Sequence, residues 1–284
     1  MTKNIKEKGK FNFGDILYNI FLWVYGLISL YPLIWMLFYS FKNNDEIFVS
    51  NPFGPPTKLH FENYFDAWTQ YNVPQYFFNS IVVSVITVAL TILIALMFAY
   101  STSRMKWKGQ NFARIYISIG MFIPVQAILI PLAIIVRNLG LTNSYLSLII
   151  PYTAFNLAFS SLVFYGFFRG IPVELEEASC IDGAGIFKTF FSIIVPTVVP
   201  AIATLIIFTF LQAWNEFPIA LVLISEETMK TLPLGLLFFQ GQFTTNWGAM
   251  GATMVIASIP TILVYILFSN QVEKALTIGG AVKG

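Results

Sequence analysis

The chain has 284 residues, of which 57% are hydrophobic and only 11% are charged, and its mean hydropathy is +0.73. Soluble domains carry roughly 25% charged residues, so this composition excludes an ordinary soluble fold and indicates several membrane-spanning runs. The formal net charge of +2 is too small to indicate a nucleic-acid partner, and one cysteine, Cys180, excludes an internal disulfide and a cysteine-built metal site.

Six apolar runs are long enough to cross a bilayer, which takes about 20 mainly apolar residues. They cover residues 16–41, 77–102, 115–136, 146–168, 193–224 and 250–269. The first is too long for the apolar region of a signal peptide, and no small-residue cleavage site follows it, so we expect an uncleaved helix. The fifth exceeds one crossing, so part of it must tilt or lie at or beyond the membrane surface. We predict an all-α membrane protein with six transmembrane helices in a single domain, 1–284.

The distribution of basic residues predicts the orientation of these spans. Six spans place both termini on one side, and with that side inside, twelve of the 16 Lys and Arg residues fall in inner segments. Cytoplasmic segments carry such an excess of Lys and Arg, so we expect both termini to be cytoplasmic. The outer loops then lie at 42–76, 137–145 and 225–249, and the first contains a stretch at 61–68 that predicts a short amphipathic helix.

The inner loop between the fourth and fifth runs, GIPVELEEASCIDGAGIFKTFFSIIVPTVVP (170–200), differs from its surroundings. Its carboxylates are Glu174, Glu176, Glu177 and Asp182. Pro172 and the three glutamates predict a helix start, where they complement the helix dipole, and the glycines at 183 and 185 predict its end before a second helix from Ile186. The inner leaflet is anionic and repels such a helix. On physical grounds the segment is either a docking helix for a protein partner or a capped connector with a solvated face.

The spacing within this loop resembles the EAA loop in the permease subunits of ABC importers. Glu177-Ala178-Ser179 is followed after three residues by Gly183, and after nine more by Ile193-Ile194-Val195-Pro196. The family pattern has Ala where this chain has Ser179, and Leu where it has Val195. The resemblance implies a type I ABC importer transmembrane domain in which 170–192 is the cytoplasmic coupling loop. It implies that the segment 174–196 couples alternating access to a separate ATPase through Glu177, Ala178, Asp182, Gly183 and Pro196.

Two further stretches resemble the carbohydrate permeases related to the MalG-type maltose subunit. They are FLQAWNEFPIALVLI at 210–224 and the C-terminal ALTIGGAVKG. The resemblance implies import of an oligosaccharide across a bacterial cell membrane, with a second, MalF-like permease subunit, two MalK-like ATPase subunits and an extracytoplasmic sugar-binding protein. ATP and Mg would be bound by the ATPase subunits, and no cofactor is expected in this chain.

Three other groups of residues are candidates for a site. Glu216 is the only charged residue deep in an apolar run, so with Trp214 and Asn215 it is either part of a translocation path or gate, or a structural hydrogen-bond partner for the other permease subunit. The resemblance implies that Gln240, Gly241, Gln242 and Thr244 form a scoop loop that enters the binding protein. It also implies that the C-terminal tail, with Gly280 and Lys283, contacts the ATPase subunits, although a glycine-rich terminus is usually disordered.

Three other classes of membrane protein fit less well. A secondary transporter often shows internal repeats and more than six spans, and neither is evident, while intramembrane charges for ion coupling are nearly absent. A channel subunit would need a filter motif such as TVGYG, which this sequence does not contain. With one histidine, His60, and no HExxH, GxSxG or P-loop motif, the chain is not expected to be an enzyme or to bind ATP itself.

Overall fold

The computed structural model describes residues 13–239 and 245–281, and most of these residues are helical. The chain forms two compact units, one made of Met1–Ala67 with Gln242–Ile256 and the other of Trp68–Gly241 with Ala257–Gly284. The last helix, α13 (Trp247–Ala281), passes from the first unit into the second.

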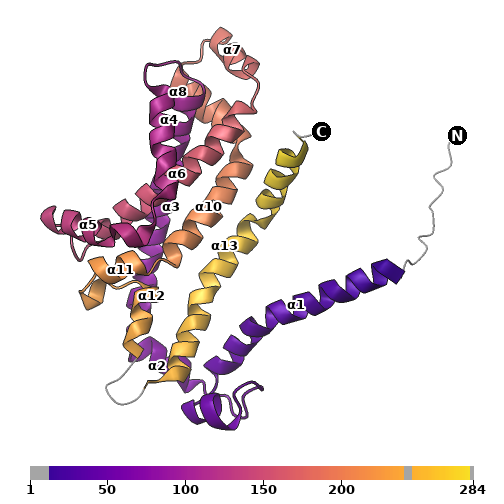
Figure 1. Cartoon of the computed structure of the whole chain (residues 1–284), viewed down its shortest axis with the longest axis vertical. Helices are drawn as coiled ribbons and strands as arrows, with labels where there is room; N and C mark the ends of the chain where they lie inside the picture. The colour runs from indigo at the N-terminus through magenta and orange to yellow at the C-terminus, as the bar shows by residue number, and fades with distance from the viewer. Residues whose placement is uncertain (1–12, 240–244, 282–284) are drawn as a thin grey trace. The chain divides into compact units, whose positions relative to one another are not determined.

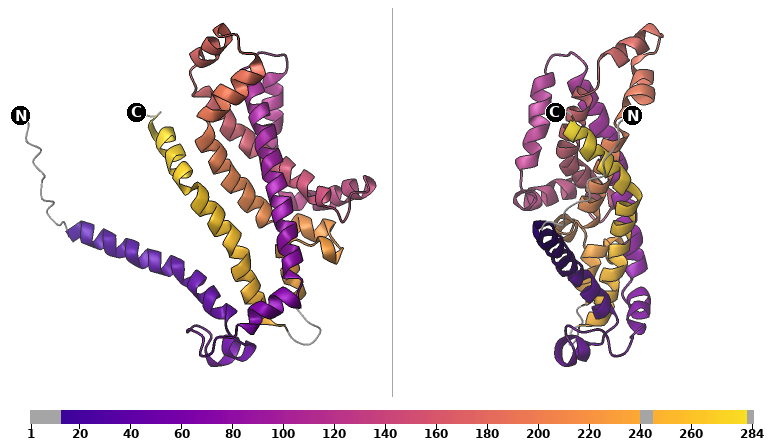
Figure 2. Two further views of the ribbon diagram at one scale, coloured as in Figure 1. Left: turned by 180° about the vertical axis from the view of Figure 1, so that it is seen from behind. Right: turned by 90° about the vertical axis from the view of Figure 1, so that its right-hand side faces the viewer.

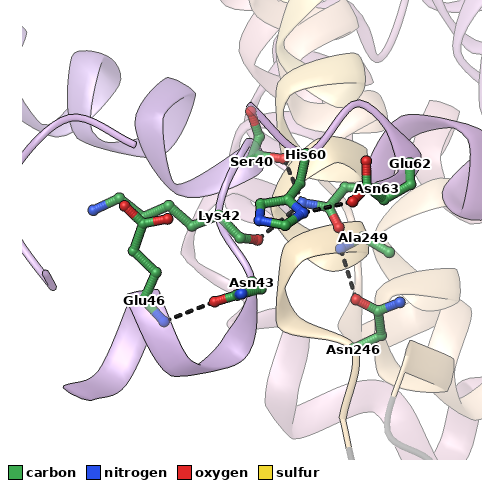
Figure 3. Close-up of polar contacts among 9 residues, drawn as sticks. All are labelled: Ser40, Lys42, Asn43, Glu46, His60, Glu62, Asn63, Asn246 and Ala249. Atoms are coloured by element: carbon green, nitrogen blue, oxygen red, sulfur yellow. Dashed lines mark hydrogen bonds and ion pairs between the residues drawn. The ribbon is translucent and has the colours of Figure 1, made fainter. Parts of the chain in front are cut away.

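The first unit contains α1 (Phe13–Ser40), a π-helical turn η1 (Glu46–Ser50), most of α2 (Glu62–Thr69) and the start of α13. Helix α2 is the one expected at 61–68. Its Asn63 donates from Nδ2 to the carbonyls of Ser40 and Lys42, both at 2.9 Å, and so fastens α2 to the end of α1 (Figure 3). The first outer loop is therefore an ordered structure held by buried polar groups.

The second unit is built on three long helices, α3 (Val73–Ser103), α6 (Tyr145–Arg169) and α10 (Val199–Trp214), which lie side by side (Figure 1). Each is apolar along its length. Phe164, Phe168, Ile194 and Leu205 are fully buried where the three helices meet. Because these side chains pack on one another, the core of this unit runs along the α3–α6–α10 contact.

Two of the expected spans are broken rather than straight. One consists of α4 (Gln110–Ile119), η2 (Gly120–Phe122) and α5 (Val125–Asn138), and the segments Gln110–Phe122 and Val125–Asn138 meet at 107°. Ile123 and Pro124 have extended backbones, and proline has no N–H to continue the helix. Figure 2 shows α5 leaving the α3–α6 pair at a steep angle. The span expected at 115–136 is therefore bent, and it is one crossing only if the two pieces count together.

The second break lies in the run expected at 193–224. The helical segment that leads into this run starts earlier, and consists of α8 (Ile186–Thr189), η3 (Phe190–Ile194) and α9 (Val195–Thr197). This segment meets α10 at 77° around Val198, and α10 ends at Trp214. The run is thus longer than one crossing because it contains three differently directed pieces, the last being α11 (Pro218–Leu223).

The helices that are long and apolar enough to cross a membrane number four among the described residues, or six if each bent pair is one span. The four are Ile16–Ser40, Val73–Ser103, Tyr145–Gly170 and Trp247–Asn270. They correspond to the expected spans at 16–41, 77–102, 146–168 and 250–269, and the two bent pairs correspond to the other two. The all-helical membrane fold is confirmed at this level.

The two ends of the second unit carry different short elements. Helix α7 (Glu174–Ile181) and α8 lie at one end of the α3–α6–α10 group, and α11, η4 (Glu227–Met229), α12 (Leu232–Gly235) and η5 (Leu236–Phe239) lie towards the other (Figure 1). Asn79 of α3 donates to the carbonyls of Thr228 and Lys230, both at 2.8 Å. The Tyr76 ring packs against Gly235, where an added Cβ would come within 2.2 Å of it.

Candidate functional site

The first candidate site is the short helix α7 and the turn that follows it. The helix starts at Glu174, after Val173 at the N-cap, and its first turn carries Glu174, Glu176 and Glu177. These carboxylates complement the partial positive charge at the helix N-terminus. Pro172 lies just outside the helix rather than in its first turn, so the helix starts two residues later than expected, at 174 instead of 172.

Gly183 ends α7 in the manner expected from the sequence. Its φ is +75°, in the left-handed region that L-residues rarely adopt. The Gly183 N–H donates to the Cys180 carbonyl and the Ala184 N–H donates to the Ser179 carbonyl, both at 3.0 Å. This is the Schellman arrangement, which satisfies the last free carbonyls of a helix and reverses the chain. The second helix, α8, then begins at Ile186, as expected.

A buried pair of hydroxyl groups joins the two short helices. Ser179 Oγ and Thr189 Oγ1 are 2.7 Å apart, and both residues are only 3% exposed. Ser179 is the position at which the EAA pattern has its third alanine, so this chain adds a hydrogen bond there. The sequence showed only that the residue is small, because its partner lies ten positions away.

The opposite side of α7 is open. Glu177, Ala178, Asp182 and Gly183 are all exposed, and Ile181 is 86% exposed. The structure thus brings four of the five expected coupling residues together on one accessible turn. Pro196 is also exposed but lies in α9, beyond η3, next to the bend at Val198.

Glu176 differs from its neighbours because it points inward. Its Oε1 lies 3.2 Å from Nε of Arg104, and the two side chains are 19% and 8% exposed. Arg104 follows the last residue of α3 and also donates to the carbonyls of Phe168 and Ile171. The sequence singled out neither role, since nothing in a single chain shows that residues 104 and 176 meet.

The second candidate site centres on Glu216. Its carboxylate accepts from the backbone N–H groups of Ile219 at 2.7 Å and Ala220 at 3.1 Å, and from the Tyr152 hydroxyl at 2.5 Å. It therefore caps α11 and ties α11 to α6. The same residue lines a hollow of about 60 Å³ that Asn156 and Gln212 also line. These hydrogen bonds all lie within this chain, so the two expectations for Glu216, a place in a path or gate and a bond to the other permease subunit, both stay predictions.

Trp214 and Asn215 lie next to Glu216 but differ in exposure. Trp214 is 2% exposed, its ring stacks on Phe210, and its Nε1 donates to the Ala257 carbonyl at 3.0 Å. No face of this ring is free for a sugar in this structure, because the surrounding side chains cover it. Asn215 is exposed, and its Nδ2 donates to the Leu211 carbonyl at 2.9 Å.

The remaining candidates lie at the edge of the described structure. Gln240, Gly241, Gln242 and Thr244, expected in a scoop loop, lie outside the described residues, as does Lys283. Gly280 lies in α13, which continues to Ala281. The glycine-rich tail is therefore helical as far as Ala281, and its contact with the ATPase subunits stays a prediction.

Comparison with known proteins identifies the family. Residues 91–278 match the model of the family described as binding-protein-dependent transport system inner membrane component. A probable ABC transporter permease protein, YurM, of Bacillus subtilis is 36% identical over 98% of this chain and 92% of its own length. The diacetylchitobiose uptake system permease protein NgcG of Streptomyces coelicolor is 34% identical over 92% of this chain and 86% of its own.

The trehalose/maltose transport system permease protein MalG of Thermococcus litoralis is 33% identical over 91% of this chain and 93% of its own. Among solved structures, a chain of a bacterial ABC transporter involved in the import of the polysaccharide alginate has the same fold. That match has a TM-score of 0.81 at 22% identity and covers 93% of this chain and 99% of the other. This chain belongs to the family of inner membrane components of binding-protein-dependent transport systems.

Proposed function

We propose that this permease subunit carries an oligosaccharide through the membrane in an ATP-driven importer. Its relatives NgcG and MalG are named for the uptake of diacetylchitobiose and of trehalose and maltose, and each aligns with more than nine tenths of this chain. The observation that carries the proposal is the exposed turn of α7, which displays Glu177, Ala178, Asp182 and Gly183 together.

The chain itself is a transport component, and ATP hydrolysis is assigned to separate subunits. If α7 docks into such an ATPase subunit, movement of the ATPase subunit would be passed to the membrane helices. ATP and Mg would be bound by the ATPase subunits. The apolar Ile181 and the carboxylate of Glu177 offer both a hydrophobic and a charged contact on one side of α7. The ATPase surface that matches them would be a groove with a basic rim.

The proposed topology has six spans with both termini in the cytoplasm of a bacterial cell. Each bent pair then counts as one crossing. The excess of Lys and Arg in the inner segments supports this orientation. The coupling loop at 170–192 then lies on the cytoplasmic side, where an ATPase has access to it.

The proposed assembly contains this chain, a second MalF-like permease subunit, two MalK-like ATPase subunits and an extracytoplasmic sugar-binding protein. The chain of the second alginate structure that resembles this one, with a TM-score of 0.63, comes from a transporter in complex with a periplasmic protein that holds an alginate pentasaccharide. The segment at 240–244 is proposed to reach the binding protein, and the tail with Gly280 and Lys283 to reach the ATPase subunits.

Sugar uptake by the reconstituted complex tests this function. We expect radiolabelled diacetylchitobiose, trehalose or maltose to enter proteoliposomes only when the binding protein and ATP are present. A catalytically inactive ATPase subunit should abolish uptake. Uptake that persists with the inactive ATPase and follows a proton or sodium gradient contradicts the proposal.

Glu177→Lys and Gly183→Pro should release the ATPase from membranes while the permease still inserts.

A further inference from the structure

Three segments of the second unit meet at the guanidinium group of Arg104. Arg104 itself follows the end of α3, and it donates through Nη2 to the Phe168 carbonyl in the last turn of α6. The same nitrogen donates to the Ile171 carbonyl at 2.5 Å, in the link between α6 and α7. Its Nε forms the ion pair with Glu176 in the first turn of α7. One side chain thus touches the ends of both long helices and the start of α7.

The chemistry of this contact suits a rigid joint. The last carbonyls of a helix carry partial negative charge, which a cation stabilises. A guanidinium group is planar, always charged and able to donate in several fixed directions at once. A lysine ammonium is a compact point charge at the end of a flexible side chain. The contact is also shielded, because the Arg104 side chain is 8% exposed and that of Glu176 is 19% exposed. Shielded pairs are screened by salt much less than surface pairs.

The surroundings of Glu176 make the joint specific to this one glutamate. Glu174 and Glu177 occupy the same helical turn but are exposed, and neither forms an ion pair among the described residues. Ser179, one turn further along α7, is buried against Thr189. The inner side of α7 is therefore attached at both ends, to α3 through Glu176 and to α8 through Ser179.

We propose that Arg104 is a positioning residue that makes α7 move together with the ends of α3 and α6. This inference rests on the proposed coupling function of α7. Force applied to the exposed side of α7 then reaches α3 directly through the Arg104–Glu176 pair. Without this pair, the force would reach the membrane helices only through α8 and η3, which lead into α10.

Distances between spin labels test the joint in the complete complex in nanodiscs. The native Cys180 on α7 and a cysteine at Lys106, just beyond α3, carry the labels, and both positions are exposed. In the otherwise unchanged protein we expect one narrow distance distribution that is the same with and without a non-hydrolysable ATP analogue and Mg. In Arg104→Gln we expect a broader distribution that shifts when the analogue binds. The labelled complexes must still retain the ATPase subunits.

Conservative variants separate a joint from a general packing role. Arg104→Lys keeps the charge but not the fixed donor directions, so it should restore part of the narrow distribution. Glu176→Gln should behave like Arg104→Gln, and the double variant should be no worse than either single variant. Glu174→Gln removes a negative charge and Lys108→Gln removes a positive charge, each from an exposed position near the joint. Both variants should leave the distance distribution unchanged. If Arg104→Gln does not assemble, Glu176→Gln and Arg104→Lys provide the same comparison.

Transport gives an independent readout. The amount of labelled disaccharide imported per ATP hydrolysed should fall by about tenfold in Arg104→Gln, within the range of typical couplings between sites, while ATP hydrolysis continues. An unchanged distance distribution in both Arg104→Gln and Glu176→Gln overturns the proposal, as do additive effects in the double variant. If the unaltered complex imports no sugar, the proposed function fails, but the label distances still decide whether the joint exists.

Discussion

Gly183 shows how a single backbone conformation decides the shape of the coupling turn. Its positive φ is what allows α7 to end and α8 to start within a few residues, and no neighbouring atom lies within 4 Å of an added Cβ. A side chain at this position is therefore opposed by backbone strain alone and not by crowding. Gly185, two residues on, has a φ of −76° and equally open surroundings, so it lacks that strain.

This difference predicts the effect of substitutions at the two glycines. Gly183→Ala should destabilise the turn by about 1–2 kcal/mol, the usual cost of a left-handed L-residue. Gly183→Asn should cost less because asparagine tolerates this region, and Gly185→Ala should have little effect. The fraction of ATPase subunits that remains with the permease after detergent extraction measures the result. Equal retention in Gly183→Ala and Gly185→Ala would falsify the assignment.

The hydroxyl pair between α7 and α8 gives a second prediction. Ser179→Ala restores the alanine of the EAA pattern but removes the hydrogen bond to Thr189. We expect a loss of about 1 kcal/mol, typical of one buried hydrogen bond. It should appear as faster proteolysis of the loop at 182–185. The same substitution in a Thr189→Val background should add almost nothing, and full additivity of the two changes would contradict the contact.

At this scale the sequence predicted the exposed residues better than the buried ones. The turn at Gly183 was identifiable because a helix end with a left-handed residue favours glycine, whereas the coupling role of Glu177 stays a prediction that the EAA resemblance implies. Arg104 and Tyr152 were missed because their importance lies in partners at positions 176 and 216, and a single sequence carries no record of such pairing. The stacking of Phe210 on the Trp214 ring was missed for the same reason.

At the scale of the elements, length and apolar character predicted the four unbroken spans and the excess length of the fifth run, but they did not locate either bend. Apolar residues continue through both breaks, so the hydrophobic pattern has no gap there. The positions of the prolines do not predict the bends either. Pro32, Pro131, Pro151 and Pro260 all lie inside helices, whereas Pro124 stands at a break. The difference depends on tertiary packing around each proline.

The attachment of α12 to α3 provides a prediction at this scale. Gly235→Ala would place a methyl group within 2.2 Å of the Tyr76 ring, so the ring or α12 must move. We expect a loss of about 1–3 kcal/mol, the usual cost of overpacking a buried contact. A lower thermal denaturation midpoint in detergent would report it. Gly166→Ala in α6 is the control, because no atom lies within 4 Å of its added Cβ, and it should leave the midpoint nearly unchanged.

For the whole molecule, composition and the distribution of basic residues predicted a multispan helical membrane protein, and the helices agree with it.

The direction of insertion has a simple test. Cys180 should react with a membrane-impermeant maleimide only when the cytoplasmic side is accessible. In a Cys180→Ser background, a cysteine at the exposed Lys58 should react from the opposite side. Labelling of both positions from the same side would contradict the six-span topology.

The bend at Val198 has a mechanical consequence. The arm from Ile186 to Thr197 is about 18 Å long at the rise of an α-helix. A rotation of about 10° around Val198 therefore displaces its far end by about 3 Å. Pro196 and Pro200 flank this point and contribute no N–H groups, so few backbone hydrogen bonds resist the rotation. The arm also carries the buried side chains of Phe190 and Ile194, which pack in the same core as Phe164 and Phe168 of α6. A rotation around Val198 would therefore move the coupling turn together with the adjoining ends of α3 and α6, by a distance comparable to an atomic diameter.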